Sequence, residues 1–175
     1  LQALVKEGQQ RMEAAGKDPA KSLVIGFDGT ADAFRSIQDD GMFRADIVQR
    51  PDLISRRQME IAVNIARGKE SVEDYPAPTY IKTPVVTAEN VDAWMGWGGN
   101  PANAPQEAEA AAPAGDDQPV KIGVIQITLE HEYQITLNEG FNAQAEEMGA
   151  EAVVCINELN PEKHVKCGED LIAAG

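Results

Sequence analysis

The chain has 175 residues, of which 43% are hydrophobic and 25% charged, and its formal net charge is −14. This length allows one domain or two small ones with a sizeable core, and the composition is ordinary for a globular protein. The negative charge excludes a protein that neutralises nucleic acid with clustered Lys and Arg, so we expect no nucleic-acid partner. No apolar run approaches the roughly 20 residues of a membrane-spanning helix.

The first half of the chain alternates between predicted helices and strands. Leu1–Ala15 has apolar residues at helical spacing, and Gly16 is placed as a left-handed C-cap. Leu23–Phe27 is a continuous apolar run, typical of a strand buried on both faces. After a turn we expect a helix at Ala31–Asp39, a strand at Ala45–Val48, a helix from Pro51 to Arg67 that buries Ile54, Ile61, Ala62 and Ile65, and an extended segment at Tyr80–Thr87.

Residues 96–119 interrupt this pattern. They consist mainly of Gly, Asn, Pro, Ala, Glu and Asp, which bury too little apolar surface to offset the entropy of ordering, so we expect a flexible linker. Regular structure resumes at Val120, with a strand at Ile122–Ile127, a helix at Gln134–Glu147, a strand at Ala152–Ile156, and a helix opened by Asn160-Pro161 that carries Val165, Leu171 and Ile172 inward. This order predicts right-handed βαβ units, and hence an α/β fold with parallel sheets flanked by helices.

The two cysteines are Cys155, in a predicted strand, and Cys167, in the helix that follows. No CxxC motif or clustered His accompanies them, so we predict no metal site. The sequence favours two buried thiols that behave as small hydrophobic residues. The alternative is a disulfide between strand and helix, which requires Cα atoms about 5.5 Å apart.

The motif Gly26-Phe27-Asp28-Gly29-Thr30 follows the first predicted strand. An Asp-x-Asp-Gly-Thr loop is the nucleophile loop of haloacid-dehalogenase phosphatases, but Gly26 stands where the attacking carboxylate is required, so we expect no enzyme. Asp28 remains at the carboxyl end of a parallel strand, where open α/β sheets bind ligands, and its carboxylate can accept two sugar hydroxyls. The alternative is that Asp28 only caps the helix that begins near Ala31.

Three further residues are candidates for contact with a polyhydroxylated ligand. Gln49 ends the next strand, where its amide can donate to and accept from a polyol, although a role in stabilising the turn is the alternative. His131 and Tyr133 follow the strand at Ile122–Ile127 and offer a polar contact and an aromatic face for the apolar side of a sugar ring. An exposed loop histidine is the alternative for His131. We expect neither metal nor cofactor.

Together these motifs resemble those of the ribose/galactose-type periplasmic sugar-binding proteins, the substrate-binding subunits of ABC transporters with the type I periplasmic binding fold. VIQITLEHEYQITLNEGFNAQAEEMGAE is similar to the opening strand, loop and Gly-terminated helix of that family, with His131-Glu132-Tyr133-Gln134 in place of its Asn-Pro-Phe-Phe. Gly26-Phe27-Asp28 corresponds to the strand end whose Asp binds sugar hydroxyls in the family. Gln49 matches the Gln or Asn that touches the ligand at the crossing between lobes.

By this resemblance, the parts of the family's module stand in reversed order. Residues 1–95 resemble the C-terminal part of a sugar-binding module and residues 120–175 its N-terminal part, while the middle of the module has no counterpart. Three explanations remain: the junction of two tandem modules, a permuted and shortened chain, or a sequence that joins separated parts. The linker resembles the N-terminal tether of a secreted lipoprotein, which favours a junction and a periplasmic or extracellular, lipid-tethered location.

The resemblance implies that two lobes close over a small sugar or polyol and deliver it to an ABC permease, without a cofactor. Asp28, Gln49 and His131 would hold its hydroxyls, and Tyr133 would stack on the ring. Alternatives are the ligand-sensing core of a regulator or chemoreceptor and, less favoured because of Gly26, a phosphatase-like α/β enzyme. Because half of a module is missing, we expect the chain alone not to bind sugar tightly and to need the missing segments or a swapped, complementing copy of itself.

Overall fold

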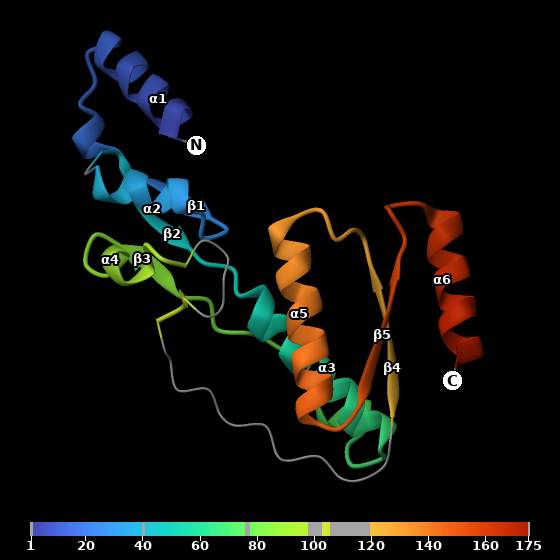
Figure 1. Ribbon diagram of the computed structural model, residues 1–175. Helices are drawn as coiled ribbons and strands as arrows, with labels where there is room; N and C mark the ends of the chain where they lie inside the picture. Colours follow the sequence, from blue (N-terminus) through green and yellow to red (C-terminus); the bar gives the residue numbers. More distant parts are fainter. Residues whose placement is uncertain (1, 40, 76–77, 98–102, 106–119, 175) are drawn as a thin grey trace. The chain divides into compact units, whose positions relative to one another are not determined.

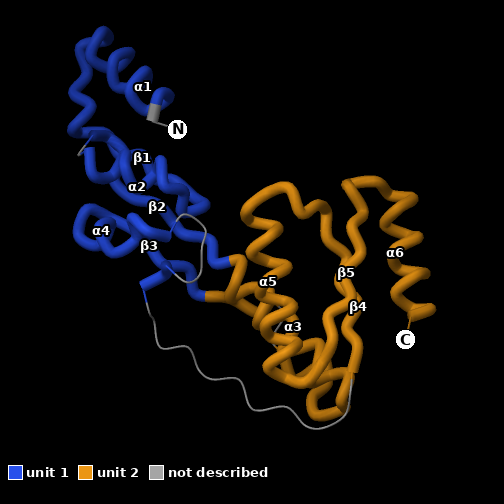
Figure 2. The backbone as a smooth tube through the Cα atoms, in the orientation of Figure 1, with its two compact units in different colours: residues 1–50, 82–108 blue, residues 51–81, 109–175 orange. Residues whose placement is uncertain are grey.

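The structure is a computed structural model (Figure 1) that describes residues 2–39, 41–75, 78–97, 103–105 and 120–174. The chain divides into two compact units, each described here by itself (Figure 2). Unit 1 comprises Leu1–Arg50 and Lys82–Ala108, and unit 2 comprises Pro51–Ile81 and Glu109–Gly175. Both contain parallel strands flanked by helices, as predicted. Most of the expected linker at 96–119 lies outside the described residues. No helix among the described residues is long and apolar enough to cross a membrane.

Unit 1 is built on a three-stranded sheet of order β1-β2-β3. The bounds of its elements are α1 Gln2–Ala14, η1 Pro19–Lys21, β1 Val24–Phe27, α2 Ala31–Gln38, β2 Phe43–Ile47, β3 Val85–Thr87 and α4 Val91–Trp94. Strands β1 and β2 are parallel, with Gly26 opposite Asp46. Strand β3 runs antiparallel to β2, with Val86 opposite Asp46. The carboxyl ends of β1 and β2 therefore lie at the same edge of the sheet.

The core of unit 1 lies on one face of this sheet. Phe34, Val48 and Val86 are fully buried there, and the rings of Trp94 and Trp97 meet edge to face with centroids 5.8 Å apart. Both tryptophans thus pack within the core of the unit. On the other face the side chains of Ile25 (55%) and Phe27 (57%) are exposed. The prediction that both faces of this strand are buried is wrong for the described residues, because α2 and α4 pack against one face only.

Unit 2 contains a second, two-stranded sheet. Its elements are α3 Pro51–Ala66, η2 Val72–Asp74, β4 Lys121–Gln126, α5 Glu132–Glu147, β5 Glu151–Ile156 and α6 Pro161–Ala174. Strands β4 and β5 are parallel and in register from Lys121 opposite Glu151 to Gln126 opposite Ile156. Helices α3 and α5 lie side by side, and α6 lies on the other side of the strands (Figure 1). This confirms the predicted parallel pairing of the strands at 122–127 and 152–156.

Helix α3 contacts α5 through a stripe of residues four apart. Ser55, Met59 and Val63 are buried on this stripe, and Met59 and Val63 pack in the core of the unit. Gly140 of α5 permits a close approach, since a Cβ there would collide with the Ser55 hydroxyl and lie 2.9 Å from the Asp52 carbonyl oxygen. The predicted burial of Ile54, Ile61, Ala62 and Ile65 is wrong, because the helices meet along the neighbouring ridge and leave these four half-buried.

A disulfide joins α6 to the sheet. Cys155 of β5 and Cys167 of α6 are bonded, with Cα atoms 5.6 Å apart, so the favoured prediction of two free thiols is wrong and its alternative holds. Helix α6 packs back along β5, which brings the two cysteines together although they are 12 positions apart.

Few residues of α6 face the sheet. Leu171 packs inward, and a Cβ at position 123 would lie 3.2 Å from its side chain, so Gly123 allows this close packing. Val165 (61% exposed) and Ile172 (83% exposed) face outward, contrary to prediction. Among the described residues of α6, Cys167 is the one that is fully buried, so the disulfide is the main attachment of this helix to the sheet.

Candidate functional site

The carboxyl edge of β1 and β2 brings Asp28 and Gln49 together. Asp28 directly follows β1, and Gln49 lies two residues beyond the end of β2. The Gln49 Nε2 group donates a hydrogen bond of 2.8 Å to Asp28 Oδ1. Asp28 is exposed and Gln49 is half-buried, so the pair is accessible to a ligand. Such a pair offers carboxylate acceptors beside an amide that can both donate and accept, which suits the hydroxyls of a polyol.

Asp28 does not cap helix α2. The Thr30 hydroxyl accepts a hydrogen bond of 3.2 Å from the Ala33 amide, as an N-cap side chain does. Asp28 instead has a φ of 119°, which is unusual for a residue with a side chain, and Gly29 follows with a φ of 75°. Strained backbone of this kind is concentrated at ligand sites, where the surrounding structure must hold it in place. The capping alternative for Asp28 is therefore wrong.

Asp46 of β2 accepts a hydrogen bond from this loop. It was not predicted as a site residue from the sequence. Its side chain is buried at 1% exposure, and its Oδ2 accepts a hydrogen bond of 2.8 Å from the Gly29 amide. The pKa of Asp46 is raised to about 6, mainly by burial and also by the negative charge of Asp28, while the backbone N–H groups of Gly29 and Thr30 oppose the shift. A charged residue between the apolar Ala45 and Ile47 was the available signal, because an Asp is rarely buried without a reason.

The space beside the Asp46 carboxylate explains the glycine at position 26. A Cβ at Gly26 would collide with Asp46 Oδ1 and lie 2.5 Å from the end of the Phe43 ring. The position that carries the nucleophile in phosphatases is thus a glycine here because its neighbours occupy the volume of any side chain. This observation agrees with the prediction from sequence that the loop lacks phosphatase chemistry.

Arg50 is a second residue that the sequence analysis missed. It is 6% exposed, and its guanidinium carbon lies 5.3 Å from the centroid of the Trp97 ring, a cation–π arrangement. Arg50 directly follows Gln49, so a buried side chain packed on Trp97 adjoins the residue that bonds Asp28. The only sequence signal was its position between Gln49 and Pro51.

His131 and Tyr133 lie in unit 2, not in unit 1 with Asp28 and Gln49. His131 is exposed at the N-cap position of α5, where its carbonyl oxygen accepts from the Gln134 and Ile135 amides at 2.9 and 3.0 Å, while its side chain forms no capping bond. Tyr133 is 38% exposed in the first turn of α5. The candidate residues therefore fall into two groups, one at a sheet edge in each unit, which we call the candidate half-sites of unit 1 and unit 2.

Buried amides organise the half-site in unit 2. Gln126, at the end of β4, is 4% exposed and donates from Nε2 to the Gln134 carbonyl oxygen at 3.1 Å. Asn157, just beyond β5, accepts from the Leu159 amide at 2.9 Å, and its Nδ2 lies 2.9 Å from Nδ1 of the exposed His164. These amides hold the loop after each strand in place, and neither was singled out from the sequence.

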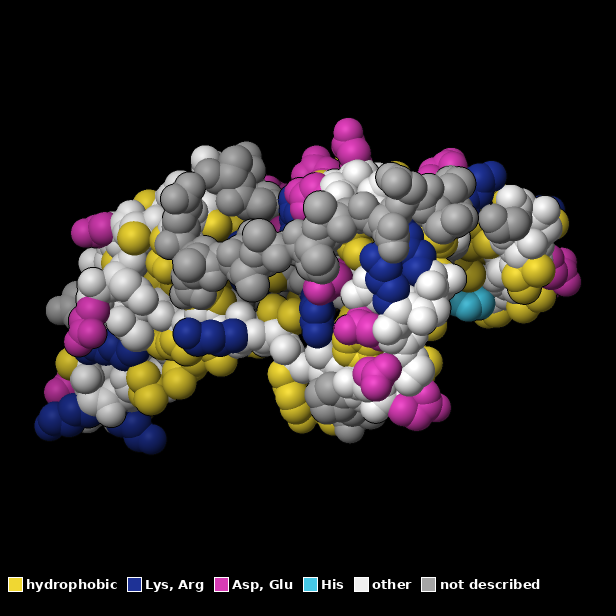
Figure 3. All heavy atoms as spheres, turned by 90° about the horizontal axis from the view of Figure 1, so that it is seen from below, with side chains coloured by type: hydrophobic (Ala, Val, Ile, Leu, Met, Phe, Trp, Pro, Cys, Tyr) yellow, Lys and Arg dark blue, Asp and Glu magenta, His cyan; other side chains and the backbone are white. Residues whose placement is uncertain are grey.

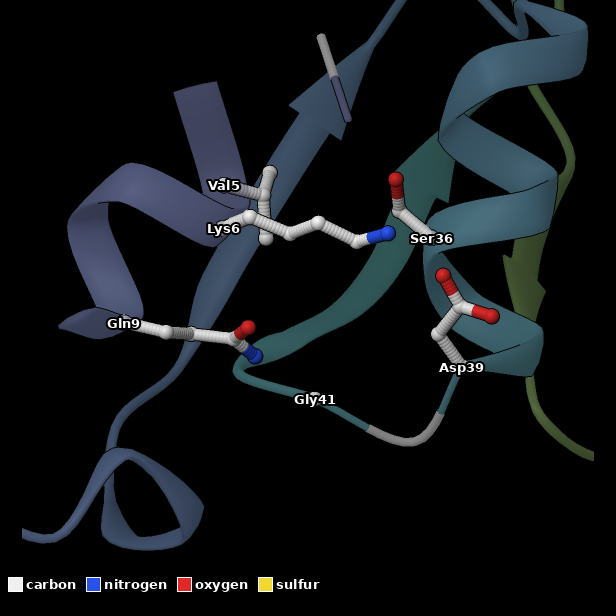
Figure 4. Close-up of a pocket in the computed structure, with 6 residues that line it drawn as sticks. All are labelled: Val5, Lys6, Gln9, Ser36, Asp39 and Gly41. Carbon is white, nitrogen blue, oxygen red and sulfur yellow. The ribbon is translucent and has the colours of Figure 1, made fainter. Parts of the chain in front are cut away.

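Other features of the described residues involve none of the positions predicted from the sequence. Among the residues that the structure describes, no three His, Cys, Asp or Glu side chains are grouped to hold a metal ion. A pocket of about 270 Å³ is lined by Val5, Lys6, Gln9, Ser36, Asp39 and Gly41, none of them a candidate from the sequence (Figure 4). On the face seen in Figure 3, Asp and Glu side chains occur singly or in small groups, as solvated helix faces do.

Comparison with curated proteins finds similarity to ribose import binding proteins, although no family model matches the chain. The protein from Bacillus subtilis is 38% identical over 74 residues, which are 42% of this chain and 23% of the relative. Those from Salmonella typhimurium and Escherichia coli are 37% and 35% identical over 65 residues, or 37% of this chain and 21% of each relative. The chain resembles part of a ribose-binding protein. It spans less than a quarter of the length of these relatives.

This similarity supports the resemblance to ribose-type periplasmic binding proteins over a fragment. By their names, the relatives bind ribose for import. The matches do not bear on the reversed order of the two parts, which stays a prediction.

Proposed function

We propose that this chain is part of a solute-binding protein that captures a small sugar or polyol and passes it to an ABC permease. The observation that carries the proposal is the hydrogen bond of 2.8 Å between Gln49 and Asp28 at the carboxyl edge of two parallel strands. Ligands of open α/β sheets bind at such edges, and this pair matches the donors and acceptors of adjacent hydroxyls. The similarity to ribose import binding proteins makes D-ribose the first candidate.

The two half-sites then have complementary tasks. Asp28 and Gln49 hydrogen-bond the hydroxyls from one lobe. His131 adds a hydrogen bond from the other, and Tyr133 covers the apolar side of the ring. Closure of the lobes encloses the sugar without a cofactor. By the resemblance, the protein works in the periplasm or outside the cell, with the linker at 96–119 as its tether.

The order of the parts has a consequence for assembly. We propose that residues 1–95 and 120–175 are the C-terminal and N-terminal parts of sugar-binding modules, joined by the linker. The exposed side chains of Ile25, Phe27 and Val85 (51%) favour this proposal, because a contiguous apolar face is costly in water. The missing segments of a module, or a swapped and complementing second copy of the chain, would cover that face.

Calorimetric titration with a panel of sugars tests the function. The complete protein that contains this chain should bind D-ribose or a related polyol saturably, and Asp28→Asn should weaken binding at least tenfold, the usual effect of removing a charged hydrogen-bond partner. Asp32→Asn is the matched control, since the Asp32 side chain is 48% exposed and pairs with Arg35 outside the candidate site. An absence of saturable binding to any sugar in the panel would refute the proposal.

The 175-residue chain provides a second test. We expect it to bind the same sugar much more weakly than the complete protein, because it holds only part of a module. Submicromolar binding by the isolated chain, shown to be a monomer by light scattering, would contradict the proposed incompleteness but not the sugar-binding function. No observation favours a sensor core over a transport protein, and Gly26 argues against a phosphatase.

A further inference from the structure

Asp46 is a buried carboxylate with an unusual set of neighbours. Its Oδ2 accepts from the Gly29 amide at 2.8 Å, whereas its Oδ1, also buried, has no hydrogen-bond partner in the described part of the chain. An ionised carboxylate with an unsatisfied buried oxygen lowers the free energy of unfolding. A residue with this cost is expected to have a role other than stabilising the fold. The role we infer is control over the loop that carries Asp28.

The loop depends on the bond to Asp46. Asp28 and Gly29 both have positive φ, and the Asp46 carboxylate accepts from the Gly29 amide at 2.8 Å and also interacts with the Thr30 N–H group. The loop's other backbone anchor is the Asp28 amide, which donates to the Ile47 carbonyl oxygen at 2.9 Å. A hydrogen bond to a carboxylate is roughly twice as strong as one to a neutral oxygen, so the charge on Asp46 matters for the order of the loop.

The charges around Asp46 come from few elements. Strands β1 and β3 contribute no charged side chain, and the loop after β1 contributes Asp28, whose negative charge opposes ionisation of Asp46. Helix α2, which packs against β2, carries Asp32 and Arg35, paired with each other at 2.5 Å on an exposed face. On β2 itself Arg44 is the other charged residue. The electrostatic repulsion between Asp28 and Asp46 therefore couples the ligand site to the ionisation of Asp46.

We propose that Asp46 is a positioning residue of the ligand half-site: its carboxylate holds the Gly29 amide and thereby Asp28, and its protonation in mildly acidic solution loosens the loop. The link to a ligand rests on the proposed function, while the link between Asp46 and the loop does not. The device makes capture of a polyol by Asp28 and Gln49 stronger at neutral than at acidic pH. Solute capture would then respond to the acidity of the surrounding medium.

Nuclear magnetic resonance of the full 175-residue chain tests the coupling without a ligand. The Gly29 amide proton should lie downfield at neutral pH and move upfield as the pH falls through about 6, the pKa of Asp46. This transition should disappear in Asp46→Asn, which keeps the shape of the side chain and removes the charge. Asp28→Asn should lower its midpoint, and the control Asp32→Asn should leave it unchanged. A Gly29 resonance that does not titrate, or that titrates equally in Asp46→Asn, would overturn the proposal.

Titration with D-ribose at millimolar concentration separates this inference from the proposed function. We expect the response of the Asp28 and Gln49 amides to require about fivefold more D-ribose at pH 5 than at pH 7.5, the usual worth of one hydrogen bond. Asp46→Asn should bind equally at both pH values. No response at either pH would agree with the expected incompleteness of the chain, and the Gly29 titration would then decide the role of Asp46. Equal pH dependence in the native chain and in Asp46→Asn would refute that role.

Discussion

The two sheet edges of this protein are organised by different chemistry. In unit 1 a buried ionisable carboxylate, Asp46, holds the loop after β1. In unit 2 the neutral amides of Gln126 and Asn157 hold the loops after β4 and β5, and a disulfide fastens the helix that follows. Two edges with similar geometry should therefore respond to different conditions: unit 1 to pH and unit 2 to reducing agents.

Removal of the disulfide should have the largest effect and should be confined to unit 2. Replacing Cys155 and Cys167 with Ser should lower the stability of unit 2 by about 3 kcal/mol, because the bond closes a short loop and α6 buries little else. Hydrogen exchange should reveal faster exchange throughout α6. Exchange in α2 of unit 1 serves as the control. Equal acceleration in both helices would show that the units do not respond separately.

The pH dependence of unit 1 should be the next largest effect. The pKa of Asp46 is about 6 in the folded chain against 3.8 for an ordinary Asp, so the folded state binds more protons between these values and its stability falls as the pH rises through this window. Asp46→Asn should therefore stabilise unit 1 by about 2 kcal/mol near pH 8 and by almost nothing near pH 4.

Denaturant titration followed by tryptophan fluorescence measures this effect. Both tryptophans of the chain, Trp94 and Trp97, lie in the core of unit 1, so the signal reports that unit. Protonation of Asp46 should thus stabilise unit 1 as a whole while it loosens the Gly29 loop. A purely structural carboxylate would not produce these opposite signs. If the native chain and Asp46→Asn differed in free energy of unfolding by the same amount at every pH, the expected pH response of unit 1 would be contradicted.

The smallest effect should come from an ion pair in unit 2. Arg56 of α3 and Glu147 of α5 are 2.8 Å apart with partly exposed side chains. Exposed pairs contribute little, so Arg56→Met should cost about 0.5 kcal/mol, less at high salt. Denaturation monitored by circular dichroism would measure it. A loss above about 2 kcal/mol would mean that the additional bond from Arg56 to Gln144 (3.2 Å) supports the core, contrary to our interpretation.

Part of the candidate site could be predicted from the sequence. Asp28 and Gln49 were found because each follows a predicted parallel strand, and parallel strands place their carboxyl ends at one edge. Asp46 was not found, because whether a strand residue faces solvent or core depends on which helices cover the sheet. For the same reason the sequence misplaced the buried face of α3, where the close contact at Gly140 decides which ridge is covered.

The sequence by itself determined the order and type of the elements and the ends of several helices. Gly16, Gly68 and Gly149 have the positive φ expected where helices end, and Asn160 caps α6 with bonds to the Glu162 and Lys163 amides, because dihedral preferences and caps are local. Tertiary structure alone decided the disulfide, the burial of Asp46 and the exposed face of β1. These depend on which segments meet in space, a property that no local pattern carries.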